Sequence, residues 1–152
     1  MWHNTLVVTY CSREKDPSQD LLPARDRYLS ARIHAADEAA SRLQFGFRIL
    51  SGIYGLLEPD RMIPAYDHLL TADQVPDHAR KTAGQLAESE ARRVVFITRS
   101  TSVDPGAEPY RQSLQLACEA VGIECGVLEI TAEEPSAAAL VKKIKTPGEV
   151  LF

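Results

Sequence analysis

Four short apolar runs alternate with segments of helical periodicity, and this alternation is the strongest constraint on the fold. The runs are Thr5–Tyr10, Phe45–Leu50, Arg93–Thr98 and Glu124–Ile130. Each is nearly continuous in apolar residues, which is typical of a strand covered on both faces of a sheet. Amphipathic helices are expected over residues 27–43, 73–92, 109–121 and after residue 134, and a short last strand at 150–152.

Strands that alternate with helices predict parallel pairing through right-handed crossovers. We therefore expect an α/β fold: a single three-layer domain over residues 1–152 with a central, mainly parallel sheet of four or five strands, Rossmann-like in plan. The length of 152 residues and the apolar fraction of 45% suit one globular domain. Residues 13–25 and 58–72 are expected to be loops, with a turn of helix ending at Leu57. Thr71 or Asp73 is expected to cap the helix that follows, and Thr131 and Glu134 have the spacing of a capping box for the last one.

Charge and motif content exclude several classes of function. The formal net charge of −4 makes nucleic-acid binding possible but not favoured. The three cysteines, Cys11, Cys118 and Cys125, suit neither a disulfide framework nor a four-ligand zinc site. There is no glycine-rich dinucleotide motif, no P-loop and no paired-histidine motif, so neither a cofactor nor a metal is expected. No signal peptide and no apolar stretch of roughly 20 residues is present, so we expect a cytoplasmic protein without a membrane segment. The oligomeric state is left open.

Small hydroxyl residues follow the predicted strands, at the edge where parallel sheets bind ligands. Ser12 follows the first strand, Ser51 and Gly52 follow the second, and Ser100 follows the third. The cations Arg13, Lys15 and Arg99 lie nearby in the sequence. Hydroxyls, backbone amides and cations together suit a phosphate or a polar sugar. The alternative is that these serines only belong to loops and helix caps, where they are common.

Cys11 is the strongest single catalytic candidate because it stands at the end of the first strand. A nearby cation such as Lys15 or Arg13 favours a thiolate, which is the nucleophilic form. His34 or His68 could approach it in space. The alternative is a buried cysteine that acts as a small apolar side chain.

Two ordered motifs carry a family resemblance. The first is Cys11-Ser12-Arg13-Glu14-Lys15, followed by Pro23-Ala24-Arg25-Asp26-Arg27-Tyr28-Leu29-Ser30. The second is Leu50-Ser51-Gly52-Ile53-Tyr54-Gly55-Leu56-Leu57-Glu58-Pro59, followed by Ile63-Pro64-Ala65-Tyr66. Together they resemble the YaaA family of peroxide-stress proteins, and in particular its short bacterial and phage relatives.

The resemblance implies an α/β fold and a nucleobase or nucleotide substrate, since the short relatives occur near deazapurine and nucleic-acid modification pathways. The longer YaaA proteins are linked to DNA binding, but the helical segment credited with DNA contact has no evident counterpart here. The leading hypothesis is an enzyme that acts on a nucleoside, nucleotide or modified purine by hydrolysis or base transfer. The alternatives are a non-catalytic, stress-related nucleic-acid-binding protein and a partner-binding module.

Roles can be assigned to the motif residues within this hypothesis. Cys11 serves as nucleophile or polar anchor, Lys15 holds an anion, and Ser51 with the Gly52 amide stabilises developing negative charge. Aromatic side chains are expected to stack on a base or to bond a sugar; these are Tyr28, Tyr54 and Tyr66. Tyr28 is expected to pair with Arg32 across one helical turn. The alternative is that the motif only shapes an awkward turn between a strand and a loop.

Overall fold

The central sheet has five strands in a computed structural model that describes residues 4–131 and 135–152. They are β1 (Thr5–Tyr10), β3 (Gly46–Ser51), β4 (Gly55–Leu57), β6 (Arg93–Arg99) and β7 (Glu124–Ile130). Their order across the sheet is β4-β3-β1-β6-β7. β3, β1, β6 and β7 are parallel, and β4 runs antiparallel to β3. The predicted α/β class with a mainly parallel sheet is confirmed.

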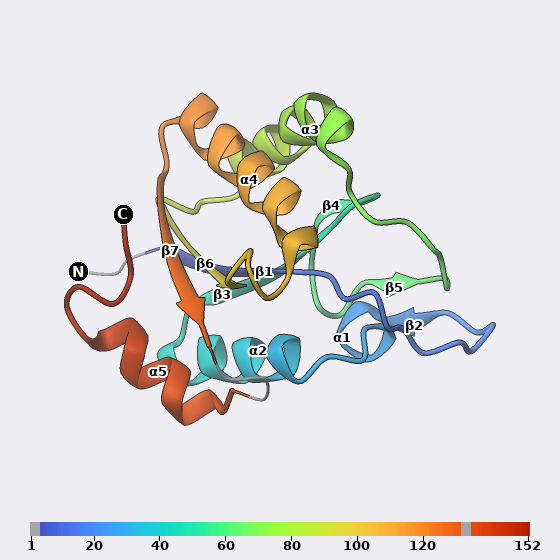
Figure 1. Cartoon of the computed structure of the whole chain (residues 1–152), viewed down its shortest axis with the longest axis horizontal. Coiled ribbons are helices and arrows are strands. Elements are labelled where there is room, and N and C mark those ends of the chain that lie inside the picture. Colours follow the sequence, from blue (N-terminus) through green and yellow to red (C-terminus); the bar gives the residue numbers. More distant parts are fainter. Residues whose placement is uncertain (1–3, 132–134) are drawn as a thin grey trace.

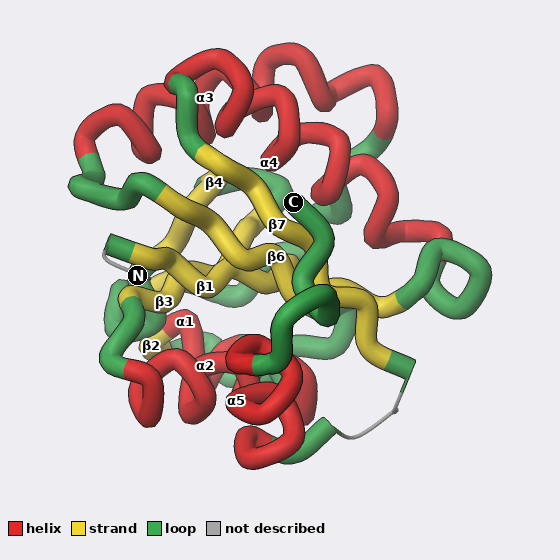
Figure 2. The backbone as a smooth tube through the Cα atoms, turned by 90° about the vertical axis from the view of Figure 1, so that its left-hand side faces the viewer, coloured by secondary structure: helices red, strands yellow, loops and turns green. Residues whose placement is uncertain are grey.

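Helices cover both faces of this sheet (Figures 1 and 2). α2 (Ala31–Leu43) and α5 (Ala137–Lys145) pack together on one face, and α3 (Val75–Glu88) and α4 (Glu108–Val121) pack together on the other. Residues in the central strands, such as Val8 and Val95, are fully buried between these layers. Burial on both faces explains why the strands appear in the sequence as uninterrupted apolar runs. No helix in the described part of the chain is long and apolar enough to cross a membrane.

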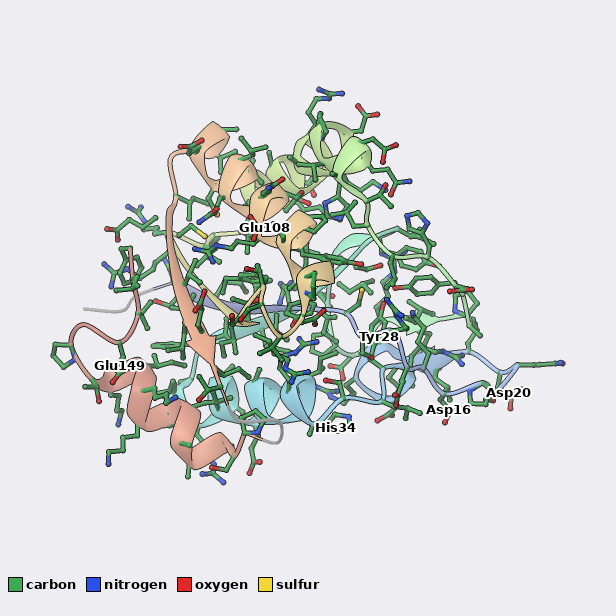
Figure 3. All side chains as sticks on the ribbon, viewed as in Figure 1. Asp16, Asp20, Tyr28, His34, Glu108 and Glu149 are labelled. Carbon is green, nitrogen blue, oxygen red and sulfur yellow. The ribbon has the colours of Figure 1, made fainter. Side chains whose placement is uncertain are left out.

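A small lobe projects beyond the carboxyl end of β1 (Figure 1). It contains α1 (Ala24–Arg27) and a two-stranded antiparallel sheet of β2 (Leu22–Pro23) and β5 (Met62–Ile63). Figure 3 shows Asp16 and Asp20 on this lobe, with Tyr28 between it and the main sheet. The fully buried Arg27 donates hydrogen bonds to the carbonyls of residues 16, 18, 20 and 63 and so holds the lobe together. Only loops were expected here, because such short elements leave no periodicity to detect.

The structure corrects the predicted helical turn that ends at Leu57. The chain instead turns back at Gly55, which has a φ of +69°, and forms β4 against β3. Gln85 of α3 secures this turn, since its amide accepts from Leu56 N at 2.7 Å and donates to the Tyr54 carbonyl at 2.9 Å. Side-chain bonds from a distant helix, rather than local helix propensity, therefore set this conformation.

Two helix starts also differ from the prediction. α2 begins at Ala31 rather than near residue 27, because Ser30 caps it by accepting from Ile33 N at 3.2 Å. α5 is capped by Ser136, whose hydroxyl accepts from Ala139 N at 3.1 Å. The capping box predicted from Thr131 and Glu134 involves a residue that lies outside the described part of the chain. Before α3, Thr71 does form the predicted cap, on a short 3-10 turn (Ala72–Gln74).

The last residues of the chain lie along the outer edge of β7. In place of a full last strand, Leu151 forms a single bridge with Val127, through two hydrogen bonds of 2.9 and 3.0 Å. The absence of a side chain at Gly126 makes this approach possible, since a Cβ there would lie 2.6 Å from both Val150 and Phe152.

Candidate functional site

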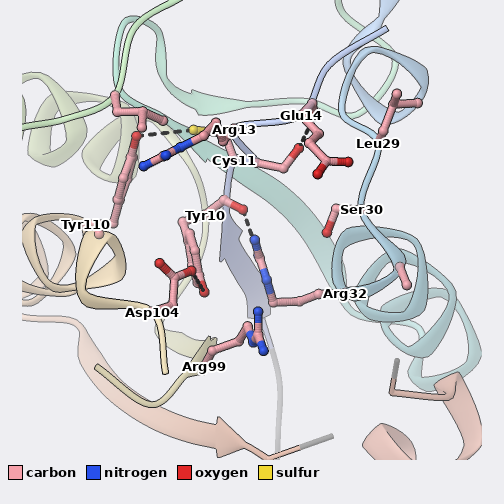
Figure 4. A pocket seen from close by; sticks show the side chains of 14 residues that line it. Tyr10, Cys11, Arg13, Glu14, Leu29, Ser30, Arg32, Arg99, Asp104 and Tyr110 are labelled. Atoms are coloured by element: carbon pink, nitrogen blue, oxygen red, sulfur yellow. Dashed lines mark hydrogen bonds between the residues drawn. The ribbon is translucent and has the colours of Figure 1, made fainter. Parts of the chain in front are cut away.

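The connections that follow β1 and β6, two neighbouring strands, leave their carboxyl ends in opposite directions across the sheet. From β1 the chain crosses through α2 to β3 on one side, and from β6 it crosses through α4 to β7 on the other. Such divergence opens a crevice between the two strand ends, the usual ligand site of open α/β sheets. A cleft of about 280 Å³ occupies this position (Figure 4). It is lined by residues from both strand ends and from the first turns of α2 and α4: Tyr10, Cys11, Ser12, Arg13, Glu14, Leu29, Ser30, Ala31, Arg32, Leu69, Arg99, Asp104, Gly106 and Tyr110.

Cys11 lies at the floor of this cleft, directly after β1. Its backbone N–H donates to the Leu50 carbonyl at 2.9 Å, which continues the pairing of β1 with β3 past the last strand residue. Its thiol donates to the hydroxyl of Tyr110 at 3.3 Å, and that hydroxyl also accepts from Leu70 N at 3.0 Å. Only 3% of Cys11 is exposed, so the sulfur can be approached only through the cleft.

Tyr110 is a neutral hydrogen-bonding partner for this sulfur. Burial, together with the nearby Cys11, raises the pKa of Tyr110 well above its ordinary value of 10. The phenol therefore keeps its proton at neutral pH. When Cys11 is deprotonated, the same hydroxyl can donate to the thiolate, since its remaining bond, from Leu70 N–H, is one that it accepts.

Charged side chains surround the cleft unevenly. Three arginines, Arg13, Arg32 and Arg99, face two carboxylates, Glu14 and Asp104. The Asp104 carboxylate accepts a hydrogen bond from the Tyr10 hydroxyl at 2.8 Å. The cleft thus has an excess of positive charge in a chain whose formal net charge is −4.

A cluster of tyrosines stands behind Cys11, outside the lining of the cleft. The Tyr28 and Tyr66 hydroxyls share a short hydrogen bond, and Tyr66 in turn bonds Ser51 Oγ at 2.9 Å. Tyr54 packs edge-on against Tyr66, with ring centroids 5.7 Å apart, and Lys15 Nζ lies 4.7 Å from the centre of the Tyr66 ring. Burial, and after it the nearby Cys11, raises the pKa of both Tyr28 and Tyr66, so both phenols stay protonated.

Ser51 is the structural centre of this cluster. It is fully buried, and its hydroxyl also accepts from the backbone N–H groups of Ile53 and Tyr54, at 3.2 and 3.1 Å. Its carbonyl is bonded to Nε2 of His78 at 2.7 Å, and Nδ1 of the same ring is bonded to Ser113 Oγ at 2.5 Å. Burial lowers the pKa of His78, which is consistent with a neutral ring in this position.

The structure brings most of the predicted site residues together but divides them between two places. Cys11, Ser12 and Arg32 line the cleft, and the tyrosine cluster holds Lys15, Tyr28, Ser51, Tyr54 and Tyr66. Gly52 does allow a close approach, but to protein atoms: a Cβ there would lie 3.0 Å from Leu70 N and 3.2 Å from the Tyr110 hydroxyl. Ser100 is not part of the cleft lining, and its hydroxyl bonds that of Ser102 at 2.7 Å.

Arg32 does not form the predicted helical pair with Tyr28. Tyr28 precedes the first residue of α2, so the spacing of four residues does not place the two side chains on one helix face. The guanidinium of Arg32 instead stacks on the ring of Tyr10, 3.6 Å from its centre. His34 does not serve Cys11 either, since its Nε2 is bonded to the carbonyl of Arg25 at 3.0 Å.

The residues that sequence reasoning missed are Tyr10, Asp104 and Tyr110. Tyr10 reads in the sequence as one more apolar strand residue, and Asp104 as an ordinary loop residue. The only sequence signal for Tyr110 was its place just after Pro109, in the first turn of a helix that follows the third predicted strand. That position predicts that a side chain lies near the ligand-binding edge, but it does not predict contact with Cys11.

In residues 4–131 and 135–152, no group of three or more histidine, cysteine, aspartate or glutamate side chains is placed to hold a metal ion. Comparison of the chain with protein-family models, curated proteins and solved structures gave no match. The chemistry of the cleft therefore supplies the argument about function.

Proposed function

We propose that this chain is an enzyme with a Rossmann-like fold that acts on a nucleoside, nucleotide or modified purine by hydrolysis or base transfer. The observation that carries the proposal is the Cys11 thiol. It lies in the cleft between the carboxyl ends of β1 and β6 and is hydrogen-bonded to Tyr110. The resemblance of the two motifs to the YaaA family supports the choice of substrate class.

Each part of the cleft has a role in this proposal. Cys11 is the nucleophile. The Tyr110 hydroxyl holds the Cys11 sulfur in position and donates a hydrogen bond to it when the sulfur is a thiolate. Leu29 and Leu69 give the cleft apolar wall for a base or a sugar face. In the first step the Cys11 sulfur bonds to the sugar carbon that carries the base, the bond to the base breaks, and the thiol proton goes to the leaving base. In the second step water or another base displaces the sulfur and returns a proton to it, which gives hydrolysis or base transfer.

Ser51 receives a different role from the one expected of it. Its hydroxyl is fully buried and engaged with two backbone amides and Tyr66, so we assign it to positioning the tyrosine cluster behind Cys11. Lys15, which lies against the rings of Tyr28 and Tyr66, belongs to the same support. Neither residue touches the substrate in this proposal.

The volume of the cleft favours a small ligand over a macromolecule. About 280 Å³ lies just below the usual range for small-molecule sites, roughly 300–1,000 Å³, and so suits a small ligand. A nucleic-acid-binding protein and a partner-binding module remain alternative predictions. The first requires binding that weakens steeply with salt, and the second a large exposed apolar patch without a polar pocket.

Alkylation of Cys11 combined with a substrate screen tests the proposal. Nucleosides, nucleotides and free purines, including deazapurines, are screened for thermal stabilisation and for release or exchange of the base by chromatography. We expect Cys11→Ala to abolish turnover, and a bound substrate to protect Cys11 from iodoacetamide. Cys125→Ser is the matched control, since Cys125 lies in β7 outside the cleft lining and this variant should keep full activity. Undiminished turnover in Cys11→Ala would disprove the role of the thiol.

A further inference from the structure

Arg32 is a buried cation whose charge is balanced only in part by the protein, through the longer-range attraction of Asp104. It is only 6% exposed, yet it forms no ion pair with any carboxylate in residues 4–131 and 135–152. Its Nη1 donates to Thr9 Oγ1 at 2.5 Å and to the Tyr10 carbonyl at 2.7 Å, both neutral acceptors. Burial of an unpaired charge is costly, so a chain that keeps one there has a use for it.

The other edge of the Arg32 guanidinium is free to bind a ligand. Nε and Nη2 have no acceptor among the described residues, and neither is sealed from solvent. These two atoms form the edge that offers two parallel N–H donors, which fits two oxygens of one oxyanion. Since Arg32 lines the cleft, this edge is available to a ligand there (Figure 4).

Arg27 shows what a purely structural buried arginine looks like in the same chain. It is also fully buried and has no ion pair with a carboxylate of the described residues, but its two terminal nitrogens donate to four backbone carbonyls of the small lobe. Its orphaned Nε is sealed from solvent, so no ligand can reach it. Arg32 differs on both points, because it uses one nitrogen for the protein and leaves the other two accessible.

The surroundings of Arg32 favour an anion, since the three arginines of the cleft outnumber its two carboxylates. Arg32 is in the first turn of α2, and that turn opens on the cleft with Ser30, Ala31 and the amide groups that a helix leaves unpaired at its start. Arg13 and Arg99 add two further cations, and neither forms an ion pair with a described carboxylate. The opposing carboxylates are Glu14 and Asp104, and Asp104 is already bonded to the Tyr10 hydroxyl.

We infer that the cleft binds a phosphate monoester, and that Nε and Nη2 of Arg32 select this ligand by donating to two of its phosphate oxygens. The substrate class is then a nucleoside monophosphate or a related sugar phosphate, rather than a free base or an unphosphorylated nucleoside. This inference rests on the proposed function for the cleft being the substrate site. It assigns the anion to Arg32 instead of Lys15, whose ammonium group lies against two tyrosine rings.

Paired ligands that differ only in the phosphate test the inference. Binding of purine and pyrimidine nucleosides, their 5′-monophosphates and inorganic phosphate is measured by titration calorimetry on the full chain. We expect at least one monophosphate to bind about 100-fold more tightly than its nucleoside. Arg32→Lys keeps the charge but loses the two-donor edge, and should weaken that monophosphate by about tenfold or more while nucleoside binding stays within about threefold. Arg42→Gln, at the far end of α2 and exposed, is the control and should change neither affinity.

Arg99→Gln provides a second test, at a residue that is less buried than Arg32. Arg99 is half-buried at the end of β6, and its replacement should reduce the same preference for phosphate even if Arg32→Lys fails to fold. Equal affinity for a nucleoside and its monophosphate would overturn the inference, as would an unchanged preference in both variants. Phosphate-selective binding without turnover would support the inference and refute the enzyme. Turnover without a phosphate preference would support the enzyme and refute the inference.

Discussion

Gly55→Ala tests whether the turn between β3 and β4 depends on the left-handed conformation of Gly55 and on the hydrogen bonds of Gln85. Gly55 has a φ of +69°, a region that costs an alanine roughly 1–2 kcal/mol. The new Cβ would lie 2.4 Å from Gln85 Oε1, so the amide must move and lose its bonds to Leu56 N–H and the Tyr54 carbonyl. Each lost bond costs about 0.5–1.5 kcal/mol. The sum is a loss of about 2–5 kcal/mol in the free energy of unfolding.

A double-mutant cycle separates these two contributions. Gln85→Ala removes the same two hydrogen bonds directly and should cost about 1–3 kcal/mol. Once Gln85 is absent, Gly55→Ala should cost only the conformational part, so the two effects should fall short of additivity by the shared hydrogen-bond part, about 1–3 kcal/mol. Urea unfolding followed by circular dichroism gives the values, and the single Gly55→Ala change should lower Tm by about 5–15 °C.

Gly84→Ala is the control for this cycle. It makes the same substitution one residue from Gln85, in the exposed interior of α3, where a Cβ would meet nothing within 4 Å. There the change should leave stability unchanged or raise it by up to about 1 kcal/mol. A neutral effect of Gly55→Ala, or strict additivity with Gln85→Ala, would refute the role given to the turn.

Two further predictions concern buried groups elsewhere. Burial lowers the pKa of His78 below its ordinary value of 6.5, so as the pH falls the unfolded chain takes up this proton before the folded chain does. The free energy of unfolding should therefore be unaffected by His78 above pH 6.5 and should fall as the pH drops from 6.5 toward the pKa of the folded state. The slope should reach at most about 1.4 kcal/mol per pH unit, and unfolding of His78→Gln over pH 5–8 should show a flatter profile; an unchanged profile would contradict this. Arg27→Met should cost about 3–5 kcal/mol, because four backbone carbonyls lose their donor, whereas a loss below about 1 kcal/mol in urea unfolding would show that the lobe does not depend on Arg27.

The regular elements of the fold could be predicted from the sequence because their periodicity is local. β1 and β7 have the predicted limits, and β6 extends one residue further. β4 could not be predicted, since three residues carry no period and their conformation depends on Gln85, which lies 29 residues beyond Leu56 in the sequence. The start of α2 was misplaced because the apolar pattern continues through Leu29, while the cap at Ser30 decides the boundary.

The candidate site was predictable in place but not in detail. Strand ends alone located Cys11 and Ser12 at the ligand-binding edge. They did not reveal that Arg32 turns inward onto Tyr10, because an arginine on an amphipathic helix usually faces solvent. The contact of Cys11 with Tyr110 joins residues 99 positions apart, and nothing in the local sequence signals it.

The C-terminal segment also determines whether the sheet can grow. Strand β7 is an edge strand, and its unpaired N–H and C=O groups would otherwise be a template for a strand from another copy. The bridge from Leu151 to Val127 occupies part of that template, and it fits only because residue 126 has no side chain. One methyl group at position 126 would displace the segment and leave this part of the edge open to strand pairing, so the cover on the edge of β7 depends on a glycine.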